Sequence, residues 1–357
     1  MLMKILINHP DFALLGGVSN HYEGLREHWT QNVIYNTIGG RKKFNCLKFL
    51  WLFWDVIKFV FKMMVYRPDV VLLNPSLGAT ALRRDFLFLT IARLFGVPVA
   101  VFIHGFSLEY LEKVDPIWLS KWLNKASLIF VLASFFKHKL EKIGIRTPIV
   151  LTTTKVDDTL LEGANIEKCD RSAINHLLFV ARIHKTKGIY ETIDAFDLLA
   201  ERYPFLELTI AGNGPDFSEL KTRVNQSAFS SRIHILGDLR GDALQKVYAR
   251  ADLYILPTTH AEGMPTSVLE AMAFGLPVFT RKVGGLVDFF NEKMGYITDS
   301  VDPKDFALAI EPYLNDIDLY RSVSEYNRQY AQAHFMASRV ALDIEDKIEK
   351  HILTNKR

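Results

Sequence analysis

The feature that most constrains the fold is a series of short apolar runs separated by longer segments with helical periodicity. The runs end at Gly, Pro or polar residues and lie at 4–7, 70–73, 97–103, 128–132 and 149–151. Continuous apolar runs of this length that alternate with helices are typical of parallel strands buried on both faces of a sheet. The sequence therefore predicts βαβ units. Its apolar beginning is too short for a signal peptide and is predicted to be the first strand.

The same pattern restarts after the polar stretch 161–175. Further strands are expected at 177–180, 206–211, 233–236, 253–256 and 277–280, with helices at 191–202, 217–224 and 244–249. A chain of 357 residues has room for two domains, each with its own core. We therefore predict an α/β protein with two Rossmann-like, doubly wound parallel-sheet domains. The predicted segments are residues 1–165, residues 166–335, and a C-terminal helix at 336–357 that closes the chain.

Composition and charge exclude several classes of protein. Apolar residues make up 49% and charged residues 23%, which is typical of a globular chain. The two cysteines, Cys46 and Cys169, form neither a disulfide framework nor a CxxC pair, so structural zinc is not expected and a reducing compartment fits. The net charge of +3 is too small to indicate a nucleic-acid partner. Residues 1–165 nevertheless carry 20 Lys+Arg against 13 Asp+Glu, which suggests an anionic partner for the first domain.

The two domains are expected to face a central cleft that holds the site, because ligands of open α/β sheets bind at the carboxyl ends of the strands. The densest motif follows the strand 253–256. Pro265 in this motif suits the first turn of a helix that would span 265–274. The backbone N–H groups of residues 266–268 would then form an anion site suited to a diphosphate.

Two glutamates flank this turn. Glu262 precedes the helix and Glu270 lies about one and a half turns inside it, so they can reach different parts of one ligand. A carboxylate that accepts hydrogen bonds from vicinal hydroxyls commonly holds a ribose, which we expect of Glu270. A single glutamate in such a place is more often a solvated surface residue. Two at this spacing around Gly263-Met264-Pro265 favour a ligand site.

Two cations follow the strand 177–180. Arg182 offers a planar fork to phosphate oxygens and Lys187 a point charge, and both would leave the carboxyl end of the strand toward the cleft. Alone they could be solvated loop residues. They fall, however, at the sheet edge where the anion site is expected, which favours a role in binding.

The first domain offers weaker signals. Gly16 and Gly17 follow the first strand, where glycine would let the backbone approach a ligand or would simply make a turn. His104 follows the strand 97–103, where a neutral imidazole could contact a sugar hydroxyl or could serve a structural purpose. None of these residues indicates a function by itself.

Taken together, these residues resemble the retaining glycosyltransferases of family 4, the group 1 glycosyltransferases with the GT-B fold. The resemblance extends over nearly the whole chain and is strongest from 177 to 300. The matching positions are the E-x7-E pair Glu262 and Glu270, the diphosphate-binding pair Arg182 and Lys187, the turn Gly212-x-Gly214-Pro215, the glycine loop Gly16-Gly17, and His104 near the donor sugar. The residues between the glutamates are assigned to donor binding as well: Gly263, Met264, Pro265, Thr266 and Ser267.

The resemblance implies transfer of a sugar, of hexosyl type, from a UDP- or GDP-sugar with retention at the anomeric carbon. It implies that no metal ion or other cofactor is needed. Arg182, Lys187 and helix N–H groups would stabilise the departing diphosphate, and Glu262 would orient the sugar hydroxyls rather than act as a nucleophile. The implied acceptor is a glycan or lipid-linked precursor in cell-surface polysaccharide biosynthesis. Asp316-x-Asp318 lies between C-terminal helices and is interpreted as solvated surface.

Several alternatives use the same scaffold or the same residues. An epimerase or a phosphorylase could have this fold, and a phosphorylase would need a Lys-bound pyridoxal cofactor. A non-catalytic scaffold subunit could bind a nucleotide-sugar without turnover. A paired-carboxylate hydrolase is disfavoured because Glu270 is assigned to the ribose. A dehydrogenase is disfavoured because Gly212-x-Gly214 lacks a third glycine at the expected spacing.

Residues 41–67 form a basic, aromatic segment with an apolar stretch of transmembrane length. Lys48, Asp55, Lys58 and Lys62 interrupt the stretch and fall within about 80° of one another on a helix, so one polar stripe is opposed by a wide apolar arc. Spanning a bilayer with four charges would be costly. We expect an amphipathic helix of a peripheral, cytoplasmic protein that lies in an anionic membrane interface at the inner face of the cell membrane. The alternative is a helix packed on the first sheet with its polar stripe in solvent.

Overall fold

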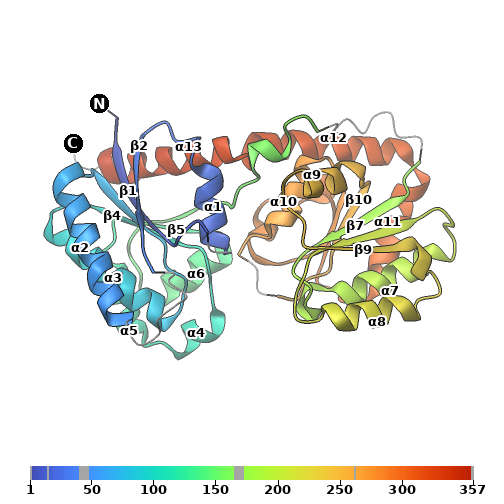
Figure 1. Ribbon diagram of the computed structural model, residues 1–357, viewed down its shortest axis with the longest axis horizontal. Helices are drawn as coiled ribbons and strands as arrows, with labels where there is room; N and C mark the ends of the chain where they lie inside the picture. Colours follow the sequence, from blue (N-terminus) through green and yellow to red (C-terminus); the bar gives the residue numbers. More distant parts are fainter. Residues whose placement is uncertain (1, 14–15, 40–47, 165–172, 261–262, 355–357) are drawn as a thin grey trace. The chain divides into compact units, whose positions relative to one another are not determined.

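The computed structural model describes residues 2–13, 16–39, 48–164, 173–260 and 263–354. Its chain divides into two compact units (Figure 1). Unit 1 comprises Met1–Lys155 and Ala337–Arg357, and unit 2 comprises Val156–Met336. Each unit holds a six-stranded parallel sheet with helices, so the predicted α/β class with two doubly wound, Rossmann-like domains is confirmed.

The sheet of unit 1 has the strand order β2-β1-β3-β4-β5-β6. Its four-residue strand β3 and five-residue strand β4 are buried along their whole length, as their continuous apolar sequences predict. The strands are β1 (Lys4–His9), β2 (Asn32–Thr37), β3 (Val70–Leu73), β4 (Val99–Ile103), β5 (Leu128–Val131) and β6 (Ile149–Leu151). The helices are α1 (Gly17–Leu25), α2 (Lys48–Tyr66), α3 (Ala79–Leu94), α4 (Leu108–Lys113), α5 (Pro116–Leu123), α6 (Ser134–Lys142) and α13 (Ala337–Ile348).

The sheet of unit 2 has the order β12-β11-β10-β7-β8-β9. Strands β7 and β10 are neighbours at its centre, although they are far apart in sequence, so the loops that follow them start side by side. The strands are β7 (His176–Val180), β8 (Glu207–Ala211), β9 (Ile233–Gly237), β10 (Leu253–Leu256), β11 (Val278–Arg281) and β12 (Gly295–Thr298). The helices are α7 (Ile189–Ala200), α8 (Phe217–Gln226), α9 (Gly241–Arg250), α10 (Thr266–Ala273), α11 (Pro303–Asn315) and α12 (Ile317–His334).

The units divide between Lys155 and Val156, ten residues before the boundary expected at 165. Val156 belongs to unit 2 because its N–H donates to the Phe335 carbonyl at 2.7 Å. The segment that follows stays on unit 2, because the Gln245 side chain donates to the Leu160 carbonyl at 2.9 Å. Val156 and Leu160 therefore belong to unit 2, although both precede the expected boundary at 165.

The polar stripe of α2 faces inward, toward strand β2. Lys58 Nζ donates to the Thr37 carbonyl at 2.8 Å and Lys62 Nζ to the Tyr35 carbonyl at 2.6 Å. Asp55 is buried and accepts from the Gly39 N–H at 2.9 Å. These three side chains therefore form hydrogen bonds with backbone groups of the edge strand β2 and of Gly39 just after it. The expectation that the polar stripe is in solvent is wrong for these three residues. Residues 41–47 of the predicted segment lie outside the described part of the chain.

The opposite face of α2 is apolar and exposed. Phe53 is 62% exposed and Trp54 51%, and the arc continues with Leu50, Ile57, Phe61, Met64 and Val65. Trp51 and Tyr66 are exposed as well, on the side of the polar stripe. The inner side of the helix also buries Phe59 and Met63 in the core of unit 1. An amphipathic helix usually buries its whole apolar arc, so α2 is unusual in leaving this wide second apolar face exposed. Among the described residues, no helix is both long enough and apolar enough to cross a membrane.

Candidate functional site

In unit 2 the predicted anion site lies at the start of α10. Pro265 is the residue before the helix, and Thr266 is its first residue, one position later than predicted. The Val268 N–H donates to the Pro265 carbonyl at 3.1 Å. One of the three N–H groups expected to face an anion is therefore already used within the chain.

Two buried tyrosines fix the first turns of α10. The Tyr248 hydroxyl, from α9, lies 2.8 Å from Glu270 Oε2. The Tyr254 hydroxyl, from β10, lies 2.7 Å from Ser267 Oγ and 3.0 Å from the Val180 carbonyl. Burial raises the pKa of Tyr248 well above its usual range, and the neighbouring Glu270 carboxylate adds to the shift, so this hydroxyl keeps its proton and donates. The Glu270 carboxylate is therefore held in one orientation on a rigid element.

The loop after β7 is fixed against the loop after β10. The carbonyl of Thr186 accepts from the backbone N–H groups of Thr259 at 2.8 Å and His260 at 3.0 Å. Gly188 has φ +79°, and a Cβ atom there would lie 2.5 Å from the Pro257 carbonyl oxygen, so only glycine fits this approach. These contacts place Lys187 beside the segment that leads into the E-x7-E motif.

Arg182 lies on a segment that packs against the turn Gly212-x-Gly214. A Cβ at Gly212 would lie 1.9 Å from the Ala181 carbonyl oxygen, and one at Gly214 would lie 2.1 Å from that of Ile183. Both glycines are therefore required for packing against the residues on either side of Arg182. The Arg182 side chain itself is exposed. This packing role was not predicted, because a Gly-x-Gly spacing does not show which segment approaches it.

The first glutamate of the motif, Glu262, lies outside the described residues. Immediately after it, the Gly263 carbonyl accepts from the Gly285 N–H at 2.8 Å, and Met264 is buried. The structure thus brings together Lys187, the β10 loop and the α10 turn with Glu270.

In unit 1 the predicted residues lie at the carboxyl ends of β1 and β4. His104 Nε2 lies 3.1 Å from Asn74 Oδ1, because β3 and β4 are neighbours and both residues follow their strands directly. The His104 ring also stacks on Phe102 with 3.6 Å between centroids. Burial lowers the pKa of His104 to about 3, so the ring is neutral at pH 7. Asn74 was not identified from the sequence.

Gly16 and Gly17 stand at the start of α1. Gly16 precedes the helix with an extended φ of −179°, which any residue can adopt. A Cβ added at either glycine would meet no described atom within 4 Å. Neither backbone conformation nor packing against the described residues therefore requires glycine at these two positions.

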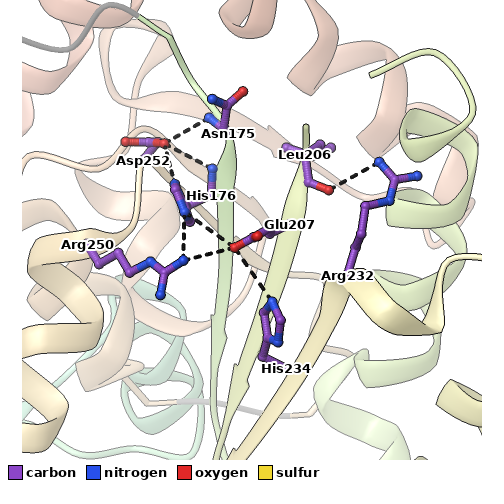
Figure 2. Close-up of polar contacts among 8 residues, drawn as sticks. All are labelled: Asn175, His176, Leu206, Glu207, Arg232, His234, Arg250 and Asp252. Carbon is purple, nitrogen blue, oxygen red and sulfur yellow. Dashed lines mark hydrogen bonds and ion pairs between the residues drawn. The ribbon is translucent and has the colours of Figure 1, made fainter. Parts of the chain in front are cut away.

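A second polar cluster lies at the amino ends of the strands of unit 2 (Figure 2). Glu207 Oε2 lies 3.4 Å from His176 Nε2, 3.6 Å from His234 Nε2 and 3.0 Å from an Arg250 guanidinium nitrogen. Buried Asp252 accepts from the backbone N–H of His176 at 2.9 Å, which ties β10 to β7. The cluster borders a hollow of about 430 Å³. It lies at the amino ends of the strands, whereas α10 follows the carboxyl end of β10. Its contacts hold neighbouring strands together.

The Asp-x-Asp pair has a structural role. Asp316 caps α12, since its carboxylate accepts from the backbone N–H groups of Asp318 at 3.0 Å and Leu319 at 2.9 Å. Asp318 is an exposed residue 3.6 Å from Arg321. Within the described ranges, no three His, Cys, Asp or Glu side chains are grouped so that they could hold a metal ion.

Comparison with known proteins bears directly on unit 2. Residues 171–330 match the family of group 1 glycosyl transferases. This segment contains Arg182, Lys187 and Glu270. An uncharacterized glycosyltransferase of Methanocaldococcus jannaschii is 33% identical over 141 residues, which are 39% of this chain and 36% of that protein. The amylovoran biosynthesis glycosyltransferase AmsK of Erwinia amylovora is 26% identical over 192 residues, 50% of this chain and 46% of that protein.

The chain thus aligns with less than half the length of these two curated relatives. A solved structure extends the comparison to both units. Anabaena Alr3699/HepE in complex with UDP has a TM-score of 0.73 at 16% identity, and the alignment covers 98% of this chain and 100% of that one. At that identity the likeness shows the fold, and the fold is GT-B.

Proposed function

We propose that this protein is a retaining, metal-independent glycosyltransferase of family 4 that transfers a hexosyl group from a UDP- or GDP-sugar. The observation that carries the proposal is the arrangement at the carboxyl edge of unit 2. There the Thr186 carbonyl fixes the Lys187 loop to the β10 loop, and Tyr248 holds Glu270 on α10. A cation and an oriented carboxylate on neighbouring rigid elements suit the phosphate and ribose ends of a nucleotide. UDP is the first nucleotide to test, because Alr3699/HepE was solved with it.

The residues would divide the work as follows. Arg182, Lys187 and the start of α10 would stabilise the negative charge that develops on the leaving diphosphate, which is the largest contribution open to such a site. Glu270 would accept hydrogen bonds from the ribose hydroxyls. Glu262 would orient the donor sugar, and the departing phosphate oxygen would take the proton of the acceptor hydroxyl.

The remaining donor contacts would come from short backbone segments. Residues 263–267 would surround the diphosphate from the α10 side. Gly16 and Gly17 would approach it with bare backbone, as the open space around both glycines allows. His104 would present a neutral imidazole to the donor sugar.

The acceptor is proposed to be a glycan or lipid-linked precursor of a cell-surface polysaccharide. AmsK is described as a protein of amylovoran biosynthesis, and the exposed apolar arc of α2 suits a lipid surface. Tryptophan and other aromatic side chains favour the membrane–water interface. We place the protein at the inner face of the cell membrane as a peripheral enzyme. The Lys58 and Lys62 ammonium groups are bound to backbone carbonyls of β2, so apolar insertion rather than these two charges would supply the attraction.

Calorimetric titration with UDP, GDP and their sugars, with a chelator present, tests the donor site first. We expect selective binding by one nucleotide, followed by transfer with retained anomeric configuration in an acceptor assay. Binding without turnover would favour a scaffold subunit. Pyridoxal absorbance in the purified protein would favour a phosphorylase, and no binding at all would contradict the residue assignments.

A further inference from the structure

A buried hydrogen-bond network surrounds His104 in unit 1. The Asn74 side-chain oxygen lies within hydrogen-bond distance of two groups, the Tyr22 hydroxyl at 2.6 Å and His104 Nε2 at 3.1 Å. The Asn74 side-chain nitrogen lies 2.8 Å from the backbone carbonyl oxygen of Asn8. Tyr22 is fully buried and Asn74 is 6% exposed, so the geometry is that of a packed interior.

The orientation of the Asn74 amide follows from this network. A backbone carbonyl can only accept, so the group that faces Asn8 must be the donating NH₂. A flipped amide would set two acceptor oxygens 2.8 Å apart inside the protein, without a proton between them. The Asn74 oxygen therefore faces Tyr22 and His104, and it can only accept from both.

The protonation of His104 follows in turn. Its Nε2 faces an acceptor, so Nε2 must carry the proton. Burial keeps the second proton off the ring, since it lowers the pKa of His104 to about 3. Nδ1 is then unprotonated and carries a lone pair that can accept a hydrogen bond. Among the described residues it has no hydrogen-bond partner. His104 is partly exposed, so this lone pair is the polar function that the ring can offer to a ligand.

We propose that Asn74 is a positioning residue that locks His104 in the Nε2–H tautomer, so that His104 acts on its ligand only as a hydrogen-bond acceptor, through Nδ1. The proposal rests on the function above for the identity of the ligand and predicts a contact in which a donor-sugar hydroxyl donates its proton to Nδ1. An imidazole with a proton on Nδ1 would instead donate to the sugar. The two cases differ in which sugar analogues the enzyme accepts.

The surroundings keep this arrangement neutral. His21, from α1, lies 4.9 Å from His104 between ring centroids. Burial lowers the pKa of His21 well below its usual value, with His104 and Lys155 adding to the shift, so no second cation forms beside the ring at pH 7. The proton of the Tyr22 hydroxyl also stays in place, because burial raises its pKa well above the usual range.

Imidazole nitrogen NMR on the ¹⁵N-labelled full-length protein tests the tautomer without any substrate. We expect His104, identified by loss of its signals in His104→Gln, to be in the Nε2–H form and to stay so from pH 7 to pH 5. In Asn74→Leu we expect a mixture of tautomers or the Nδ1–H form. Asn36→Leu is the matched control, because it removes another buried amide that contacts Asn8 and not His104. The Nδ1–H form in the unaltered protein, or an unchanged tautomer in Asn74→Leu, would overturn the proposal.

Donor analogues test the consequence. A fluorine atom in place of a hydroxyl can accept but not donate, so one deoxyfluoro analogue of UDP-glucose, or of the nucleotide-sugar that calorimetry selects, should lose about tenfold in kcat/KM. Asn74→Leu should reduce that discrimination to near unity, while Asn36→Leu should preserve it. If no deoxyfluoro position is discriminated, the acceptor role fails. If no nucleotide-sugar is used at all, the proposed function fails, and the NMR result still decides the tautomer.

Discussion

Gly17 offers a test at the level of one residue. It opens α1, its surroundings leave room for a methyl group, and its backbone is not left-handed. Gly17→Ala should therefore stabilise unit 1 by about 0.5–1 kcal/mol, because alanine loses less backbone entropy in a helix. The same methyl group should weaken donor binding if the backbone approaches the ligand there. Thermal unfolding and calorimetry on one preparation measure both effects, and unchanged binding would remove the glycine loop from the site.

Buried His21 and partly buried His104 predict how stability depends on pH. Both have a lowered pKa in the folded protein, and it returns to about 6.5 on unfolding. Below pH 6.5 these histidines bind protons in the unfolded chain but stay neutral in the folded protein. The free energy of unfolding therefore decreases as the pH is lowered. His104, whose folded pKa is about 3, should contribute a slope that approaches about 1.4 kcal/mol per pH unit as the pH falls from 6.5 to 5, and His21 should contribute in the same direction. His21→Leu should remove its share of this slope, which denaturant unfolding at several pH values would reveal.

Local sequence locates some of the candidate site residues and not others. Arg182, Lys187 and Glu270 follow predicted strands or lie in a predicted helix, so a pattern within twenty residues locates them. Asn74 and Tyr248 act through contacts with residues on other elements, and no local pattern identifies them. Their importance depends on strand order, which sequence spacing alone does not give.

At the level of elements, α9 and α10 depend on each other through Tyr248. Tyr248→Phe removes the hydroxyl that donates to Glu270 and should cost about 1 kcal/mol of stability. A released Glu270 should weaken nucleotide binding several-fold, since its carboxylate must then be ordered by the ligand. Tyr313→Phe is the control, because Tyr313 is a buried tyrosine of α11 whose ring contacts Phe279. Equal nucleotide affinity in both variants would deny the link between Tyr248 and the site.

The orientation of α2 changes which substitutions should affect membrane binding. Phe53→Ser and Trp54→Ser should each lower affinity for anionic vesicles about tenfold, because each removes an apolar side chain that would leave water. Phe205→Ser, on an exposed aromatic of unit 2, should leave affinity unchanged. Flotation of the variants with vesicles gives the comparison.

The lysines of the same helix predict the opposite pattern. Lys58→Gln with Lys62→Gln should destabilise unit 1 through lost bonds to β2, with vesicle affinity largely kept. Strong release of this variant from vesicles, while it remains folded, would restore the view that the stripe binds lipid.

The sequence did not predict the strand at one edge of each sheet, although it predicted β6 and β9 at the opposite edges. Both β2 and β12 are outermost strands and are only partly buried, so neither has the continuous apolar run that revealed the inner strands. The stripe of α2 was found from its periodicity, but its direction was not. Periodicity gives the width of a polar face but not the direction in which it points. That direction depends on β2, whose backbone carbonyl groups accept hydrogen bonds from the lysines of the stripe.

For the molecule as a whole, the chain leaves unit 1 at residue 155 and returns to it at 337. No change in composition marks either crossing, so composition alone does not predict where the chain passes from one unit to the other. The returning helix α13 binds unit 1 through buried Glu345, whose carboxylate accepts from the backbone N–H groups of Thr30 and Gln31, both at 2.9 Å. The C-terminal residues are therefore part of the first Rossmann-like unit, although the sequence places them after the second.

Glu345→Ala tests whether the contact of α13 with unit 1 stabilises unit 1 alone. It leaves two N–H groups and the Thr30 hydroxyl without their acceptor, which should cost unit 1 about 1–3 kcal/mol. Hydrogen exchange should show faster opening of β1 and β2 and unchanged protection of β7 and β10, because the hydrogen bonds of Glu345 to the described residues all lie within unit 1. Asp346→Ala, at an exposed carboxylate of the next position, should change neither. Equal loss of protection in both units would mean that they unfold as one body, and the C-terminal helix would then couple the two halves rather than complete the first.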